Sequence, residues 1–146
     1  FFSFTHASDP IGLAAADFMI SYLDSDFFKA LTSKTKEIHK QLNKIFSKIK
    51  KQEYRIIATS YPGKIVMSVQ NPNFMIQLKT FLQKELLSRN ILFNMFLAVA
   101  EDHSKNDIND LLAGLESAVE KINNPNFNLD KETENQLVKA VFREQK

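Results

Sequence analysis

The pattern of apolar residues predicts an α+β fold: a small three-stranded sheet, antiparallel or mixed, with helices packed on one face. Several stretches repeat apolar side chains every three or four residues, which is typical of amphipathic helices. Two short stretches rich in Ile, Val and Thr flank the pair Pro62-Gly63, as in a hairpin. The predicted order is helix, helix, strand, strand, helix, strand, helix, so both kinds of element belong to a single chain.

The composition indicates a globular protein and excludes several kinds of site. The chain has 146 residues, 44% hydrophobic and 25% charged, which is enough for one domain with a core. It contains no cysteine, so disulfides, thiolate zinc sites and a cysteine nucleophile are excluded. The net charge of +2 is too small to indicate nucleic acid. No apolar run approaches the roughly 20 residues of a membrane span, and no signal-peptide pattern begins the chain. We therefore expect a cytoplasmic location, with no nucleic-acid or membrane partner.

The first predicted helix runs from about Ile11 to Leu23 and is entered through Asp9-Pro10. Aspartate is a favourable N-cap, and proline is favourable at the first helical position because its missing N–H would have no partner there. Thr5, the turn after it and the helix N-terminus form a candidate anion site, with phosphate as the first choice. The alternative is a Thr5 hydroxyl that bonds only to local backbone. Small residues would let another backbone approach this helix: Gly12, Ala14, Ala15 and Ala16.

A long amphipathic helix is predicted from Asp26 to about Lys51, after a break or cap at residues 24–26. Its apolar stripe comprises Ile38, Leu42, Ile45, Phe46 and Ile49. Another face carries a row of lysines: Lys36, Lys40, Lys44, Lys48 and Lys51. Such a row is compatible with nucleic-acid or membrane-surface binding, but no aromatic or arginine residue interleaves it. We interpret it as a solvent-exposed helix face.

Strands are predicted in two places. Residues 55–61 form the first strand of a hairpin, and Tyr61-Pro62-Gly63-Lys64 has the proline and glycine positions of a type II turn. The apolar residues that alternate along the second strand are Ile65, Met67 and Val69. This alternation predicts one buried face. Residues 91–100 are apolar and predict a third strand.

Two helices complete the predicted fold. The first follows a break at residues 71–73 and ends near Asn90. The second is capped by Ser104 or Asn106 and stops at the polar residues after Ile122. The apolar stripe of this second helix comprises Ile108, Leu111, Leu112, Leu115, Val119 and Ile122. For residues 127–146 we expect a loosely packed tail with a short helix around residues 132–142.

Three histidines stand alone in the sequence: His6, His39 and His103. We expect an exposed loop position for His6 and a solvated position for His39. His103 lies beside Glu101 and Asp102, but neighbouring positions do not easily converge on one ion, and no second histidine lies three or four residues away. We therefore predict no metal site.

The chain also has no GxSxG, P-loop or Rossmann glycine pattern.

The segment Thr5-His6-Ala7-Ser8-Asp9-Pro10, followed by residues 13–16 (LAAA), resembles the class III pyridoxal-phosphate aminotransferases. It is similar to the part of that family just beyond the cofactor lysine, and most like the glutamate-1-semialdehyde aminotransferase (aminomutase) members. The family threonine binds the cofactor phosphate of the other subunit, and the resemblance gives that role to Thr5. Ala7 and Ser8 stand where the family usually has glycine.

Three later segments resemble the same family in order and spacing. Residues 89–93 (RNILF) and 98–108 (AVAEDHSKNDI) are similar to its late helix, strand and His-Ser/Thr-x-x-Asp-Ile passage. Asn90 stands where glycine is common, and asparagine tolerates the left-handed conformation better than most residues. Val141-Phe142-Arg143 resembles the tails of some relatives. The resemblance implies a structural role for His103 in a strand-to-helix turn.

The resemblance implies that the chain is the C-terminal part of a longer, homodimeric pyridoxal 5'-phosphate enzyme that exchanges an amino group with small-molecule donors or acceptors. Residues 1–23 would end the large domain and supply an interface helix. Residues 24–126 would form the small C-terminal domain of a fold-type I enzyme, and residues 127–146 a tail. The Schiff-base lysine lies upstream in the family, so no catalytic residue is assigned to this chain. The alternative is a non-catalytic α+β domain for dimerisation or interaction.

Overall fold

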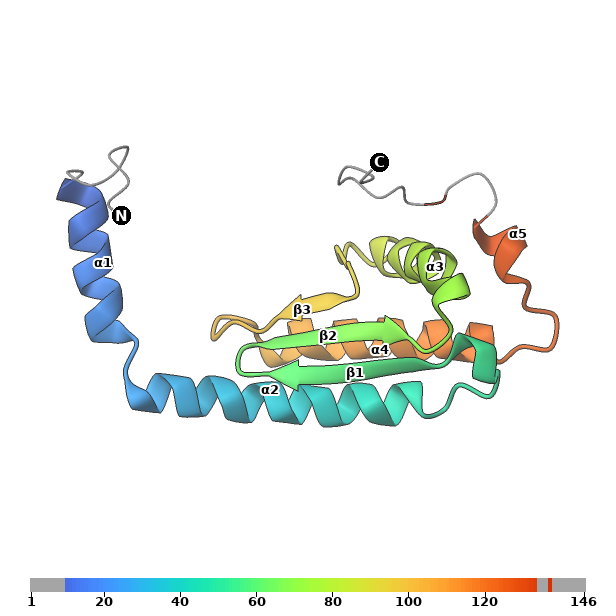
Figure 1. Cartoon of the computed structure of the whole chain (residues 1–146), viewed down its shortest axis with the longest axis horizontal. Helices are drawn as coiled ribbons and strands as arrows, with labels where there is room; N and C mark the ends of the chain where they lie inside the picture. The colour runs from blue at the N-terminus through green and yellow to red at the C-terminus, as the bar shows by residue number, and fades with distance from the viewer. Residues whose placement is uncertain (1–9, 134–136, 138–146) are drawn as a thin grey trace.

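The structure, a computed structural model, describes residues 10–133 and residue 137, and it has the predicted α+β fold (Figure 1). In chain order its elements are α1 (Pro10–Tyr22), α2 (Ser25–Phe46), η1 (Gln52–Tyr54), β1 (Ile56–Tyr61), β2 (Lys64–Val69), η2 (Pro72–Phe74), α3 (Met75–Leu87), β3 (Phe96–Ala98), α4 (Lys105–Ile122) and α5 (Leu129–Thr133). The predicted order of helices and strands is confirmed.

The sheet is antiparallel throughout, in the order β1-β2-β3, so the mixed alternative is excluded. Tyr61 pairs with Lys64 across the hairpin turn. Gly63 has a φ of 73°, the left-handed value that the third position of a type II turn requires. The predicted turn is therefore confirmed, and it places the first two strands in register.

The third strand is shorter than predicted, because β3 spans Phe96–Ala98 and not residues 91–100. Asn90 and Met95 have φ values of 61° and 55°, and left-handed residues interrupt an extended backbone. The segment still follows β2, since the Met67 N–H donates to the Met95 carbonyl at 2.8 Å. Asn90 thus has the conformation expected at a position where glycine is common.

One face of the sheet carries helices and the other faces solvent. α2 and α3 contact the strands, and α4 packs against both helices behind the sheet in the view of Figure 1. The predicted packing of helices on one face is confirmed. We call the opposite side the open sheet face; its residues are exposed and comprise Ile57, Thr59, Tyr61, Lys64, Val66, Ser68, Phe96 and Ala98.

The two long helices bury the apolar stripes that the sequence predicted. Every residue of the α2 stripe and of the α4 stripe, and Ile49 just beyond α2, belongs to the core cluster. Asp24 caps α2 by accepting hydrogen bonds from two backbone N–H groups of the first turn. α3 approaches α4 closely at Gly114, where an added Cβ would lie 2.5 Å from the Leu86 Cδ2 atom. The helical layer is therefore closely packed against itself.

The prediction that His39 is solvated is wrong. His39 is partly buried, and its Nε2 atom lies 2.9 Å from the Ala58 carbonyl of β1 and 2.9 Å from the Asn43 Nδ2 atom. β1 is an edge strand, and α2 runs along it. The imidazole thus pairs with an edge carbonyl that no neighbouring strand occupies, which protects the edge.

The lysine row mostly faces solvent, as predicted. Lys36, Lys40 and Lys44 are exposed on α2. Lys48 is also exposed, and it forms an ion pair with Glu116 of α4. Lys51 differs, because it is partly buried and its Nζ atom lies 5.2 Å from the centre of the Phe127 ring. The end of the row therefore contributes to packing.

Residues 127–133 are well packed, so the expectation of a loose tail is wrong for this stretch. The Phe127 ring lies 5.1 Å from that of Phe81, and Leu129 is 2% exposed. α5 ends at Thr133 and packs against α3, so it lies earlier than the short helix expected around residues 132–142. Aromatic packing fixes this stretch, and the sequence pattern did not reveal it. The tail segment Val141-Phe142-Arg143 lies outside the described residues.

Candidate functional site

The predicted cofactor-binding residue, Thr5, lies outside the described residues, as do His6, Ala7 and Ser8. The described residues begin with α1, the helix that follows them. α1 starts at Pro10, where the Asp9-Pro10 pair predicted a helix start. The candidate site that the structure describes is therefore α1 and the residues that attach it to the α+β body.

α1 has an apolar surface that the described part of the chain leaves open. None of its 13 residues is buried. Phe18 is 64% exposed and Ile20 is 78% exposed, and Asp17 is the one charged residue of the helix. Figure 1 shows α1 standing away from the sheet and its helices, at a sharp angle to α2. Exposed apolar surface of this kind usually marks an interface.

A chain of aromatic rings connects α1 to α2. Phe18 stacks on Tyr22 with ring centres 6.0 Å apart, and Tyr22 lies 5.5 Å from Phe27 of α2. Between the helices, the Asp24 Oδ1 atom accepts hydrogen bonds from the backbone N–H groups of Asp26 at 2.9 Å and Phe27 at 2.7 Å. This cap starts α2 directly after α1 ends, so the change of direction is confined to two residues.

α1 is also joined to the turn between β3 and α4. The Tyr22 hydroxyl donates to the Glu101 Oε2 atom at 2.6 Å. The hydrogen bond to Glu101 and the charge of that carboxylate raise the pKa of Tyr22 above its usual value. The phenol therefore remains a donor through the neutral pH range. Glu101 is exposed, so the contact is open to water on one side.

Lys34 organises the same turn from α2. Its Nζ atom donates to the backbone carbonyls of Ala100 at 2.9 Å, Glu101 at 2.8 Å and His103 at 2.7 Å. Three carbonyls converging on one ammonium satisfy backbone groups that a sharp turn leaves unpaired. We call Tyr22, Lys34 and residues 100–104 the α1 anchor. Sequence analysis missed Lys34, because it belongs to neither the apolar stripe nor the lysine row of its helix.

The end of the turn is fixed by a capping box. Ser104 accepts from the Asp107 N–H at 3.1 Å, and the Asp107 carboxylate accepts from the Ser104 N–H at 2.7 Å. These hydrogen bonds lower the pKa of Asp107. The Ala100 N–H donates to the His103 Nδ1 atom at 3.2 Å, which is a structural role in the turn. Of the two predicted caps, Ser104 is therefore the correct one.

The anchor has the chemistry of a structural joint. The described residues include no group of three His, Asp or Glu side chains placed to hold a metal ion. Glu101 and His103 are instead engaged with Tyr22 and with backbone. None of the helices in the described ranges combines the length and apolar character that a membrane span requires. What α1 offers is an apolar surface that is joined to the α+β body through Tyr22.

No protein-family model, curated protein or solved structure matches the chain.

Proposed function

We propose that the chain is the C-terminal part of a pyridoxal-phosphate-dependent aminotransferase or aminomutase of the glutamate-1-semialdehyde aminomutase kind. In this proposal Thr5 contacts the cofactor phosphate, and the α+β domain closes over the substrate. The observation that carries it is α1. This helix begins at Pro10, directly after residues 5–9, and is exposed along its whole length. Such a helix requires a second apolar surface, which a large cofactor-binding domain and a second subunit would supply.

Thr5 would act on the cofactor by binding and orientation. Its hydroxyl would donate to a phosphate oxygen near the N-terminus of α1, where backbone N–H groups and the helix dipole favour an anion. The cofactor, when bound, serves as the electron sink for amino-group transfer. The α1 anchor would hold the angle between this helix and the α+β domain, because Lys34 and Glu101 tie the two together.

Lys34 has a structural role in the turn between β3 and α4. Its Nζ atom donates to three backbone carbonyl oxygens, and the proposal gives it no part in the chemistry. The resemblance places the Schiff-base lysine before Thr5. In this proposal the chain completes a cofactor site, and the reactive amine comes from the family's upstream lysine.

A non-catalytic dimerisation or interaction domain is the second candidate, and the same helix favours it. The small residues Gly12, Ala14, Ala15 and Ala16 would let a partner helix approach α1 closely. In that case self-association through α1 would be the whole function. The two candidates differ in cofactor binding, which the apolar surface alone does not require.

The deciding experiment is Thr5→Ala in the natural protein that contains these residues. A hydrogen bond to a charged phosphate contributes about 1.5–3 kcal/mol. We expect a loss of roughly ten- to more than a hundredfold in cofactor affinity by titration, with the apo melting temperature nearly unchanged. Ser21→Ala is the matched control, because this α1 hydroxyl donates to the Phe18 carbonyl within its own helix. It should leave cofactor affinity intact.

Two results would contradict the proposal. Unchanged cofactor affinity with a lower apo melting temperature would make Thr5 a local cap. Absence of any specific cofactor binding, together with concentration-dependent association in sedimentation that α1 substitutions abolish, would favour the interaction domain. In mixed dimers, Thr5→Ala in one subunit and an inactive cofactor lysine in the other would test the cross-subunit contact.

A further inference from the structure

Two apolar surfaces are exposed in the described part of the chain, and they differ in shape. One is α1, on which Phe18 is 64% exposed. The other is the open sheet face, on which Tyr61 and Phe96 are 52% and 47% exposed. Exposed apolar surfaces that lie together usually mark an interface. A helix and a sheet commonly bury such surfaces against each other, because each forms one layer of a packed pair.

α1 lies out of reach of the open sheet face of its own chain. The Gly63 N–H of the hairpin turn donates to the Thr35 Oγ1 atom of α2 at 3.2 Å, and the start of α2 extends past the hairpin end of the sheet in Figure 1. Two residues join this start of α2 to α1, and the hydrogen bond of Tyr22 to Glu101 fixes the end of α1 there. α1 therefore stands beyond the sheet, so its docking on a sheet face requires a second molecule.

The two surfaces match in length. α1 has 13 residues, which at about 1.5 Å per residue gives a helix about 20 Å long. β1 and β2 have six residues each, which at about 3.3 Å per residue gives strands about 20 Å long. A helix about 10 Å wide therefore covers the middle of this three-stranded sheet along its whole length.

One side of α1 is suited to packing on a sheet. Residues spaced by three and four positions share that side: Ile11, Ala14, Ala15 and Phe18. The two alanines at its middle let a partner surface approach the helix backbone, and the larger residues lie at its ends. Asp17 lies at the margin of this side, and Leu13 and Ile20 lie on the opposite one. We call the first side the α1 docking side.

The open sheet face offers an apolar centre and a complementary charge. Val66 is 39% exposed and lies at the centre, because it pairs with Thr59 on one side and with Phe96 on the other. Lys64 is the charged residue of this face, and its Nζ atom lies 5.4 Å from the centre of the Tyr61 ring. The face thus carries a positive charge where α1 carries a negative one, and complementary charges favour a specific pairing.

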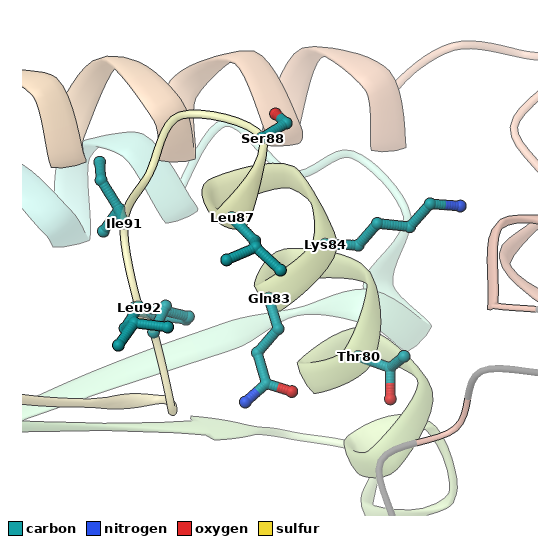
Figure 2. Close-up of a pocket in the computed structure, with 8 residues that line it drawn as sticks. Thr80, Gln83, Lys84, Leu87, Ser88, Ile91 and Leu92 are labelled. Carbon is teal, nitrogen blue, oxygen red and sulfur yellow. The ribbon is translucent and has the colours of Figure 1, made fainter.

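A groove beside α3 is the competing surface for α1 (Figure 2). It has a volume of about 540 Å³ and lies between the second half of α3 and the loop that follows this helix. Figure 2 shows Leu87 on the helix wall and Leu92 on the loop wall. The α3 residues that line the groove run from Thr80 to Ser88, which is about 12 Å of helix at about 1.5 Å per residue. The groove is therefore shorter than α1, and the open sheet face is the better match.

We propose that the α1 docking side of one copy packs on the open sheet face of a second copy, and that the second copy returns the same contact. Ala15 lies over Val66 in each contact. Asp17, at the margin, lies close to Lys64. One such contact covers only about 20 Å by 10 Å of each surface, whereas stable interfaces bury at least roughly 1,200 Å² in total. Two reciprocal contacts double the buried area and close the pair, so a two-fold dimer is expected and not an open chain of copies.

The inference rests on the second subunit that both candidate functions contain, and not on cofactor chemistry. Its tests measure association of the chain in the absence of cofactor. The Thr5→Ala titration measures cofactor affinity, so the failure of one proposal is distinguishable from the failure of the other.

Sedimentation of the full chain over a range of micromolar concentrations measures the dimer. We expect a monomer–dimer equilibrium, and Ala15→Arg should raise its dissociation constant at least tenfold, because the new side chain prevents close approach and repels Lys64. Arginine is nearly as good a helix former as alanine, so α1 is retained. Ala16→Arg is the matched control, since Ala16 lies outside the docking side, and it should leave the constant unchanged. A chain that stays monomeric, or equal effects of the two substitutions, would overturn the proposal.

Val66→Lys examines the sheet side of the contact and should also raise the dissociation constant at least tenfold. Leu87→Lys is its control, because Leu87 is 59% exposed in the groove beside α3. A mixture of Ala15→Arg and Val66→Lys chains should associate more tightly than either variant alone, since one of its two contacts joins two intact surfaces. A dimer that Val66→Lys leaves intact would mean that α1 packs on α1, and a loss with Leu87→Lys alone would move α1 to the groove; either result contradicts the proposal.

Disulfide trapping locates the contact, because the sequence contains no cysteine. Ala15→Cys combined with Val66→Cys should form a disulfide between two chains under mild oxidation at least tenfold faster than Ala16→Cys combined with Val66→Cys. All three positions are exposed and lie outside the core, so the fold is retained in each variant. Equal rates for the two pairs would refute the proposed contact. A disulfide within one chain would refute it too, because α1 would then fold onto its own sheet.

Discussion

α1 and α4 are both rich in apolar residues, yet α1 buries none of its residues and α4 buries eight. The difference lies in arrangement. α4 places its apolar residues on one side and its charges on the other, so its apolar side is buried in the core of the same chain. α1 carries a single charge, and apolar side chains such as Leu13 and Ile20 are exposed around it. A helix that is apolar on all sides is stable when other surfaces enclose it, and this domain encloses α1 on almost no side.

Truncating a leucine in each helix should give the largest difference between the two. Leu115 of α4 is 0% exposed, and Leu115→Ala should cost about 2–5 kcal/mol through lost burial and the cavity left behind. Leu13 of α1 is 60% exposed, and Leu13→Ala should change stability by less than about 0.5 kcal/mol. Denaturant unfolding of the chain measures both values. Similar costs at the two positions would mean that α1 is buried in solution.

The joint between the two regions is expected to show the next largest effect. Lys34→Met keeps the length of the side chain and removes the donors that three turn carbonyls share. Hydrogen bonds to charged groups contribute roughly 1.5–3 kcal/mol to the free energy of unfolding. Lys34 is only partly buried, so we expect the free energy of unfolding to fall by an amount near the lower end of that range. Lys36→Met is the control, since Lys36 is exposed on the same helix. Thermal melting distinguishes them, and equal effects would assign the loss to helix propensity.

Glycine-to-alanine substitutions should affect the two helices differently, destabilising α4 and not α1. In Gly114→Ala the new Cβ would lie 2.5 Å from Leu86 Cδ2 in a closely packed contact. Overpacking costs about 1–3 kcal/mol, against about 1 kcal/mol of helix propensity gained, so α4 should be destabilised. Gly12 is exposed in α1, and Gly12→Ala should raise helicity without destabilising the domain. Circular dichroism and unfolding curves report both. A stabilising Gly114→Ala would show that Leu86 moves aside freely.

The smallest effect concerns the attachment of α1. Tyr22→Phe removes the hydrogen bond to Glu101, which is exposed, so the melting temperature should hardly change. Backbone amides of α1 should exchange faster with deuterium, because the helix loses one of its contacts with the body.

The same contact predicts a dependence on alkaline pH. The pKa of Tyr22 is raised in the folded chain relative to the unfolded chain. The hydrogen bond to Glu101 therefore contributes its full stability below the unfolded pKa of about 10, and this contribution is lost as pH rises through the folded pKa. In the unsubstituted chain, the backbone amides of α1 should therefore exchange faster in that alkaline window than the intrinsic exchange rate alone predicts. In Tyr22→Phe, their exchange should follow the intrinsic rate. A uniform response in both proteins would show that Glu101 does not retain α1.

Local chemistry made much of the fold predictable from the sequence. The Pro62-Gly63 turn, the Asp24 and Ser104 caps and the periodic stripes of α2 and α4 each depend on residues within a few positions of one another. Such interactions specify where an element begins, where it ends and which side it buries. The candidate site is different. Thr5 remains a prediction outside the described residues, and nothing in the sequence marked Lys34 or the Tyr22–Glu101 contact.

The sequence by itself determined the elements and their buried faces, and the tertiary structure decided which long-range pairs form. His39 became an edge-strand partner because α2 runs along β1, and Phe127 entered the core because Phe81 lies opposite it. Lys34 found three carbonyls 66 to 69 residues away. Periodicity carries no information about such pairs, because each depends on the relative placement of whole elements. Their formation gives this domain one closed core, and among the described residues it leaves α1 exposed.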